Sequence, residues 1–61
     1  MTHAEIYRAI QQLLPQELLD KYGHLCYGEM AEVPELAPWA GDLLWAEEEW
    51  TKIDLQEAVF S

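Results

Sequence analysis

The residues best suited to chemistry in this 61-residue chain lie close together: His24, Cys26 and Glu29. An imidazole, a thiol and a carboxylate can all bind metals, but structural zinc takes four ligands, usually thiolates and imidazoles. The chain has one Cys and two His, so a complete site would need carboxylates together with the distant His3. We therefore expect no metal and no cofactor, with Cys26 a small buried side chain and His24 at the surface or in a helix cap.

The same His24 and Cys26 would share a face of a strand, as a nucleophile and base must, but they would diverge on a helix. No segment supplies an obvious oxyanion hole, and a chain this short rarely encloses the deep pocket that enzymes use. The sequence also lacks a Gly-rich phosphate loop and the spacing of a calcium loop. We expect no enzymatic activity and no catalytic residue.

Charge is divided unequally between the two halves of the chain. Residues 1–28 carry a net charge of −1, whereas residues 29–61 carry −8, with Lys52 as their only Lys or Arg. Crowded like charges oppose compaction, and a small domain has little stability to spare. The charge is therefore either tolerated for solubility or kept for a basic partner. Its sign opposes direct binding to nucleic acid or to anionic membrane surfaces.

The spacing of the carboxylates favours a basic partner. Residues three or four apart on a helix place their Cβ atoms about 5–6 Å apart, and duplex DNA presents a phosphate every ~3.4 Å along each strand. Rows of carboxylates can therefore imitate a DNA backbone, and a Trp exposed among them is typical of an interface anchor. The expected partner-binding residues are Glu29, Glu32, Glu35, Asp42, Glu47, Glu48, Glu49 and Trp45.

In size, acidity and aromatic content, the whole chain resembles the small acidic phage-encoded inhibitors that mimic DNA, including anti-CRISPR proteins. It is most similar to those that block recognition of target DNA, or of its protospacer-adjacent motif (PAM), by a type I Cascade complex. The resemblance implies a stoichiometric inhibitor whose acidic residues contact a basic DNA-binding site in the cytoplasm of a bacterial host. Gly28, Pro34, Pro38 and Gly41 interrupt the acidic stretch, so any mimicry must be assembled in three dimensions.

Two other interpretations stay open. A small adaptor or antitoxin-like module would bind through exposed aromatic residues, with charge sharpening its specificity. A subunit needed only for assembly would unfold or aggregate when isolated. Dimerisation is also a way for so short a chain to bury leftover apolar surface.

The N-terminal sequence predicts a helix, a tight turn and a second helix over residues 3–22. Thr2 and Glu5 have the spacing of a capping box, and an apolar stripe follows at helical spacing. Pro15 disfavours helical geometry at Leu14 and suits the first position of the next helix. That helix is expected over residues 15–22, with Gly23 as its stop. The stripe consists of Ile6, Ala9, Ile10, Leu13 and Leu14.

The rest of the chain is predicted to contain an irregular middle segment followed by helices. Residues 24–27 read as a short strand or extended connector ending at Gly28, and residues 30–38 hold two prolines that oppose a long regular element. A helix is expected from Pro38 to about Trp50. A short second helix follows with Asp54 as its cap, and a β-hairpin is the alternative there because apolar residues also alternate. The inner face expected for that short helix is Leu55, Ala58 and Val59.

Together these patterns predict one domain over residues 1–61, a small, compact, mainly α fold with an α+β alternative. Half of the residues (51%) are hydrophobic, which favours a folded domain over intrinsic disorder. The lone Cys26 cannot form an internal disulfide, and no apolar run approaches the roughly 20 residues that span a bilayer. The first residues also lack the pattern of a signal peptide. We expect a cytoplasmic protein without membrane contact.

Overall fold

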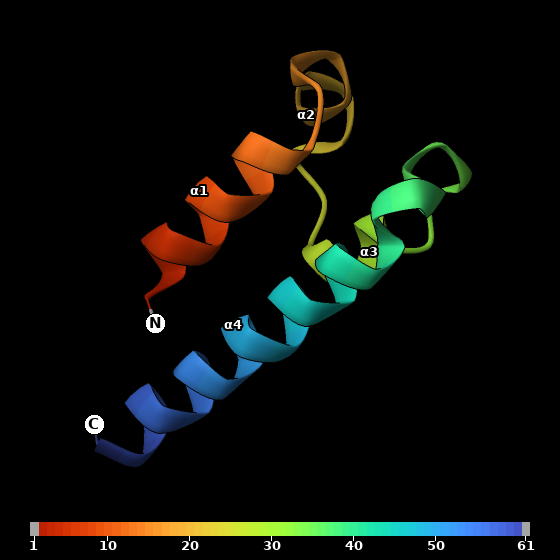
Figure 1. Cartoon of the computed structure of the whole chain (residues 1–61). Helices are drawn as coiled ribbons and strands as arrows, with labels where there is room; N and C mark the ends of the chain where they lie inside the picture. The colour runs from red at the N-terminus through yellow and green to blue at the C-terminus, as the bar shows by residue number, and fades with distance from the viewer. Residues whose placement is uncertain (1, 61) are drawn as a thin grey trace.

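The chain folds into helices in the order α1 (His3–Leu13), α2 (Gln16–Tyr22), α3 (Tyr27–Met30), the 3₁₀ helix η1 (Pro34–Trp39) and α4 (Ala40–Phe60) (Figure 1). This computed structural model describes residues 2–60, without the side chain of Phe60. The expected mainly α class is confirmed. Neither the strand nor the hairpin alternative forms within the described residues.

Helix α1 begins as the sequence predicts. Thr2 Oγ1 accepts the backbone N–H of Glu5 at 3.3 Å, and the Glu5 carboxylate accepts the Thr2 N–H at 3.2 Å. The helix ends because Pro15 favours extended geometry at Leu14, which has φ −90° and ψ 143°. Pro15 then serves as the N-cap of α2, one position before the first helical residue where it was expected. The predicted helix–turn–helix over residues 3–22 is confirmed.

The strand or extended connector predicted over residues 24–27 is wrong at its last residue, because Tyr27 already belongs to helix α3. Helix α2 stops at Gly23, where a Cβ would collide with the carbonyl oxygen of Leu19. Gly28 lies in the first turn of α3 and does not end an extended segment. Its backbone N–H donates to Glu47 Oε2 at 3.2 Å, which satisfies one of the donors that a helix start leaves free. This contact comes from a residue 19 positions away, so local sequence could not reveal it.

Helix α4 runs unbroken from Ala40 to Phe60, which corrects the prediction of a helix ending near Trp50 and a second one capped by Asp54. No Gly or Pro follows Gly41, so no residue strongly opposes continuation of the helix. Asp54 lies within the helix, with its Oδ1 atom 3.0 Å from Nε2 of His3 on α1.

The inner face predicted for the C-terminal end of α4, formed by Leu55, Ala58 and Val59, is wrong. Leu55 and Val59 were expected to be buried, but they are 62% and 80% exposed, and Ala58 is exposed as well. Helix α4 has 21 residues and is about 32 Å long, whereas the 11-residue α1 is about 16 Å long. Figure 1 shows α4 running antiparallel to α1 and extending past its start. Leu55 and Val59 therefore remain largely exposed to solvent.

Trp50 joins α1 and α3 to α4. Its ring stacks on that of His3 with centroids 4.1 Å apart, and Tyr27 meets it edge-on at 5.6 Å. The core is one cluster of apolar side chains that come mainly from α1, α3, η1 and α4. The buried members are Ile6, Ile10, Leu14, Met30, Leu36, Leu43 and Ala46.

Candidate partner-binding surface

One side of α4 gathers four of the eight predicted partner-binding residues. On a helix with about 100° per residue, Asp42, Glu48 and Glu49 each lie within about 60° of Trp45. We call these four residues the outer face. Trp45 is 37% exposed, whereas Trp39 and Trp50 pack against the core. The exposed tryptophan is therefore Trp45, which is among the partner-binding residues that the sequence predicts.

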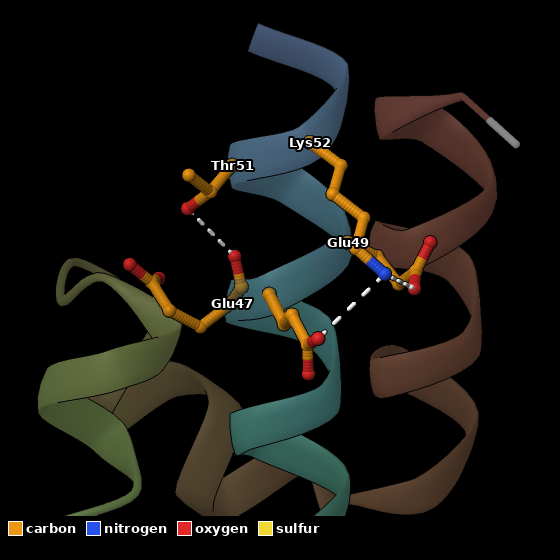
Figure 2. Close-up of polar contacts among 5 residues, drawn as sticks. Glu47, Glu49, Thr51 and Lys52 are labelled. Carbon is orange, nitrogen blue, oxygen red and sulfur yellow. Dashed lines mark hydrogen bonds and ion pairs between the residues drawn. The ribbon is translucent and has the colours of Figure 1, made fainter. Parts of the chain in front are cut away.

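Lys52 is the only Lys or Arg that α4 supplies near the outer face. Its Nζ lies 3.3 Å from Glu49 Oε1 and 3.6 Å from Glu48 Oε1. Figure 2 shows the Lys52 side chain reaching toward Glu49. The hydrogen bond with Glu49 raises the pKa of the Lys52 ammonium, and the charges of Glu49 and Glu48 raise it further. Asp42 is exposed and has no ion pair among residues 2–60. The outer face therefore keeps an excess of negative charge around Trp45.

Glu47 lies apart from its two neighbours in sequence. It is rotated by about 160° from Trp45 around the axis of α4, and its carboxylate points away from Lys52 (Figure 2). Its Oε2 atom accepts the Gly28 N–H at the start of α3. A run of three glutamates that looks continuous in the sequence is thus divided between a partly buried structural contact and the outer face.

The remaining three candidates, Glu29, Glu32 and Glu35, are all exposed and lie on α3, the turn after it and η1. Glu35 Oε1 forms an ion pair with Lys21 Nζ of α2 at 3.0 Å. This contact lowers the pKa of the Glu35 carboxyl and raises that of the Lys21 ammonium. Glu29 and Glu32 have no ion pair with a cation in the described part of the chain.

The structure therefore divides the eight candidates into three groups. Asp42, Trp45, Glu48 and Glu49 form the outer face, while Glu47 belongs to the side of α4 against which α3 packs. The third group, on α3, the turn after it and η1, is Glu29, Glu32 and Glu35. A single acidic row through residues 29–49 does not form. The partner-binding role of all eight residues stays a prediction.

Cys26 is exposed, which corrects the expectation of a small buried side chain. It is the N-cap of α3. The nearby Glu29 carboxylate raises the pKa of the thiol, and the charge of Glu47 acts in the same direction. A raised pKa lowers the fraction of thiolate, the form that acts as a nucleophile. His24 is exposed, as predicted for a surface residue.

Metal ligands do not converge within the part of the chain that the structure describes. There, no group of three or more His, Cys, Asp or Glu is placed to hold an ion. His3 stacks on Trp50 and lies against Asp54, far along the chain from His24 and Cys26.

A cleft of about 520 Å³ is a feature that the sequence analysis missed. It is lined by residues from α1, α2, α3, α4 and the connector before α3. Its aromatic side chains, Tyr7, Tyr27 and Trp50, are spread over 43 positions of the sequence. No local pattern links them, because only the packing of α1 and α3 against α4 brings them together.

The fold and surface define a small, acidic, all-helical protein. No family of proteins, no curated protein and no solved structure matches the chain. None of the helices in residues 2–60 combines the length and apolar character required to cross a bilayer.

Proposed function

We propose that this protein is a stoichiometric inhibitor that occupies the basic DNA-binding, PAM-recognising site of a nucleic-acid-binding complex, in the manner of an anti-CRISPR protein. It would act by acidic mimicry of DNA, without catalysis, in the cytoplasm of a bacterial host. The observation that carries the proposal is the outer face, where an exposed Trp45 is surrounded by three carboxylates.

The electrostatics of the chain support this function. Residues 29–61 carry a net charge of −8, and few cations of the fold compensate it. Among the Lys and Arg side chains of the described residues, Lys21 and Lys52 form ion pairs with carboxylates of this half. A field of one sign accelerates association with a partner of the opposite sign and makes binding sensitive to salt.

Trp45 is expected to add binding energy that exposed charges alone do not supply. Contacts between exposed charges are weak individually, whereas binding energy concentrates in a few residues among which Trp is enriched. A Trp at the centre of an acidic face would pack against the methylene stems of Arg and Lys or place its ring under their charges. The outer face thus combines an anchor with complementary charge.

A pair of charge-neutralising variants tests the proposal against a type I Cascade complex. The double variant Glu48→Gln/Glu49→Gln removes two charges from the outer face, and Glu17→Gln/Glu57→Gln removes two exposed charges elsewhere. We expect the first pair to weaken binding, measured by biolayer interferometry, about tenfold more than the second. Equal losses from both pairs would show that only net charge matters and would overturn the role of the outer face.

An adaptor that binds mainly through apolar contacts is the second candidate. It is favoured by the exposure of Leu44, Leu55 and Val59 on α4, at 57%, 62% and 80%. Binding that changes little between low and moderate salt but collapses in Trp45→Ala would support the adaptor. Binding that falls steeply with salt supports mimicry.

A further inference from the structure

The cleft between the helices has a mixed lining. Its apolar part includes Ile10, Leu19, Leu25 and Met30, beside the three aromatic rings of Tyr7, Tyr27 and Trp50. With a volume of about 520 Å³, it lies within the range of pockets that hold small ligands, about 300–1,000 Å³. An apolar lining of this kind favours a guest that has its own apolar portion.

Three carboxylates, from Asp20, Glu47 and Asp54, also line the cleft. Each makes a polar contact within the described part of the fold. Asp20 accepts the amide of Gln16 at 2.9 Å, Glu47 accepts the Gly28 N–H at 3.2 Å, and Asp54 lies 3.0 Å from His3 Nε2. A carboxylate has two oxygens and about four acceptor positions, so these contacts leave acceptor capacity for a guest.

No Lys or Arg is among the residues that line the cleft. The thiol of Cys26 is also part of the lining; its pKa is raised chiefly by Glu29, outside the cleft, and the charge of Glu47 acts in the same direction. A cation entering the cleft would meet carboxylates without displacing a cationic side chain of the fold. Aromatic faces add to this attraction, most strongly for a guanidinium group.

We propose that the cleft binds an arginine side chain of a basic partner protein, with its methylene stem against the apolar lining and its guanidinium against the carboxylates and aromatic rings. Arginine fits better than a small cation because it joins an apolar stem to a planar cationic head. The choice of a protein as the source of the arginine rests on the proposed function, whereas recognition of the side chain rests on the cleft alone.

Binding of N-acetyl-arginine amide to the isolated protein, followed by ¹H–¹⁵N NMR, tests the proposal. The neutral isostere N-acetyl-citrulline amide is the matched ligand. We expect saturable shifts of the Gly28 amide and the Trp50 indole, with a Kd about tenfold lower for arginine than for citrulline. Glu47→Gln keeps an acceptor for the Gly28 N–H while removing a cleft charge, so it should weaken arginine binding severalfold. Glu57→Gln makes the same change on α4 outside the cleft and should alter the Kd by less than about twofold.

Equal binding of arginine and citrulline would overturn the proposal. So would an equal loss in Glu47→Gln and Glu57→Gln, or shifts gathered around Trp45 instead of the cleft. Each of these results leaves inhibition through the outer face intact. Conversely, a chain that binds arginine in the cleft but does not bind the Cascade complex would overturn the proposed function and not this site.

Discussion

At the scale of single residues, Glu47 shows how neighbouring carboxylates acquire different tasks. Its carboxylate caps the start of α3 by accepting the Gly28 N–H, and a Cβ on Gly28 would lie 3.3 Å from Glu47 Cδ. The two residues are therefore fitted to each other. Glu48 and Glu49, the next two residues, contact only Lys52 among the charged groups of residues 2–60.

Removing the Glu47 carboxylate should destabilise the fold. We expect Glu47→Ala to lower the free energy of unfolding by about 1 kcal/mol, the usual effect of losing a helix cap. Glu47→Gln should retain most of that stability, because its amide oxygen still accepts the Gly28 N–H. Urea denaturation of both variants measures the difference. Glu48→Ala, at an exposed position, is the control and should change stability by less than about 0.5 kcal/mol.

The ion pair of Glu35 predicts that folding stability depends on pH. Contact with Lys21 lowers the pKa of the Glu35 carboxyl below its ordinary value of 4.5. The ionised form is therefore favoured in the folded state, so its contribution to stability is present above pH 4.5 and is lost as the pH falls through the lowered pKa. The stability difference between wild type and Glu35→Gln should shrink on acidification through this range. An NMR titration midpoint for Glu35 at or above 4.5 would contradict this assignment.

At the scale of helices, sequence signals were reliable where they act locally. Thr2 with Glu5, and Pro15 after Leu14, are contacts within four residues, and they fixed α1 and the turn before α2. The signals failed where a distant residue decides the structure. Glu47 helps to hold Gly28 in α3, and Asp54, which looked like an N-cap, lies in mid-helix against His3. The cleft could not be anticipated because its walls come from four helices and a connector.

Two adjacent leucines test which side of α4 faces the core. Leu43 is fully buried, whereas Leu44 is 57% exposed. We expect Leu43→Ala to lower the free energy of unfolding by about 3 kcal/mol, as for other buried leucines. Leu44→Ala should lower it by less than about 0.5 kcal/mol. Thermal denaturation compares the two variants, and similar losses would show that the inner face of α4 is placed wrongly.

At the scale of the whole molecule, the fold turns an uneven charge into separate surfaces. The molecule measures 37 × 19 × 17 Å, with α4 as its long axis (Figure 1). The outer face lies along one side of this helix, and the cleft opens on the side where α1 and α3 pack. A partner could therefore meet acidic residues on two sides of one helix, without a continuous row of carboxylates between them.

Equilibrium competition with DNA tests the central claim most directly. Binding of the protein to a type I Cascade complex would be measured at rising concentrations of a duplex that carries the PAM. Mimicry predicts that the apparent Kd rises in proportion to the concentration of duplex once this exceeds its own Kd, with no complex containing both. Simultaneous binding of the protein and the duplex, with an unchanged Kd, would contradict inhibition by occupation of the DNA-binding site.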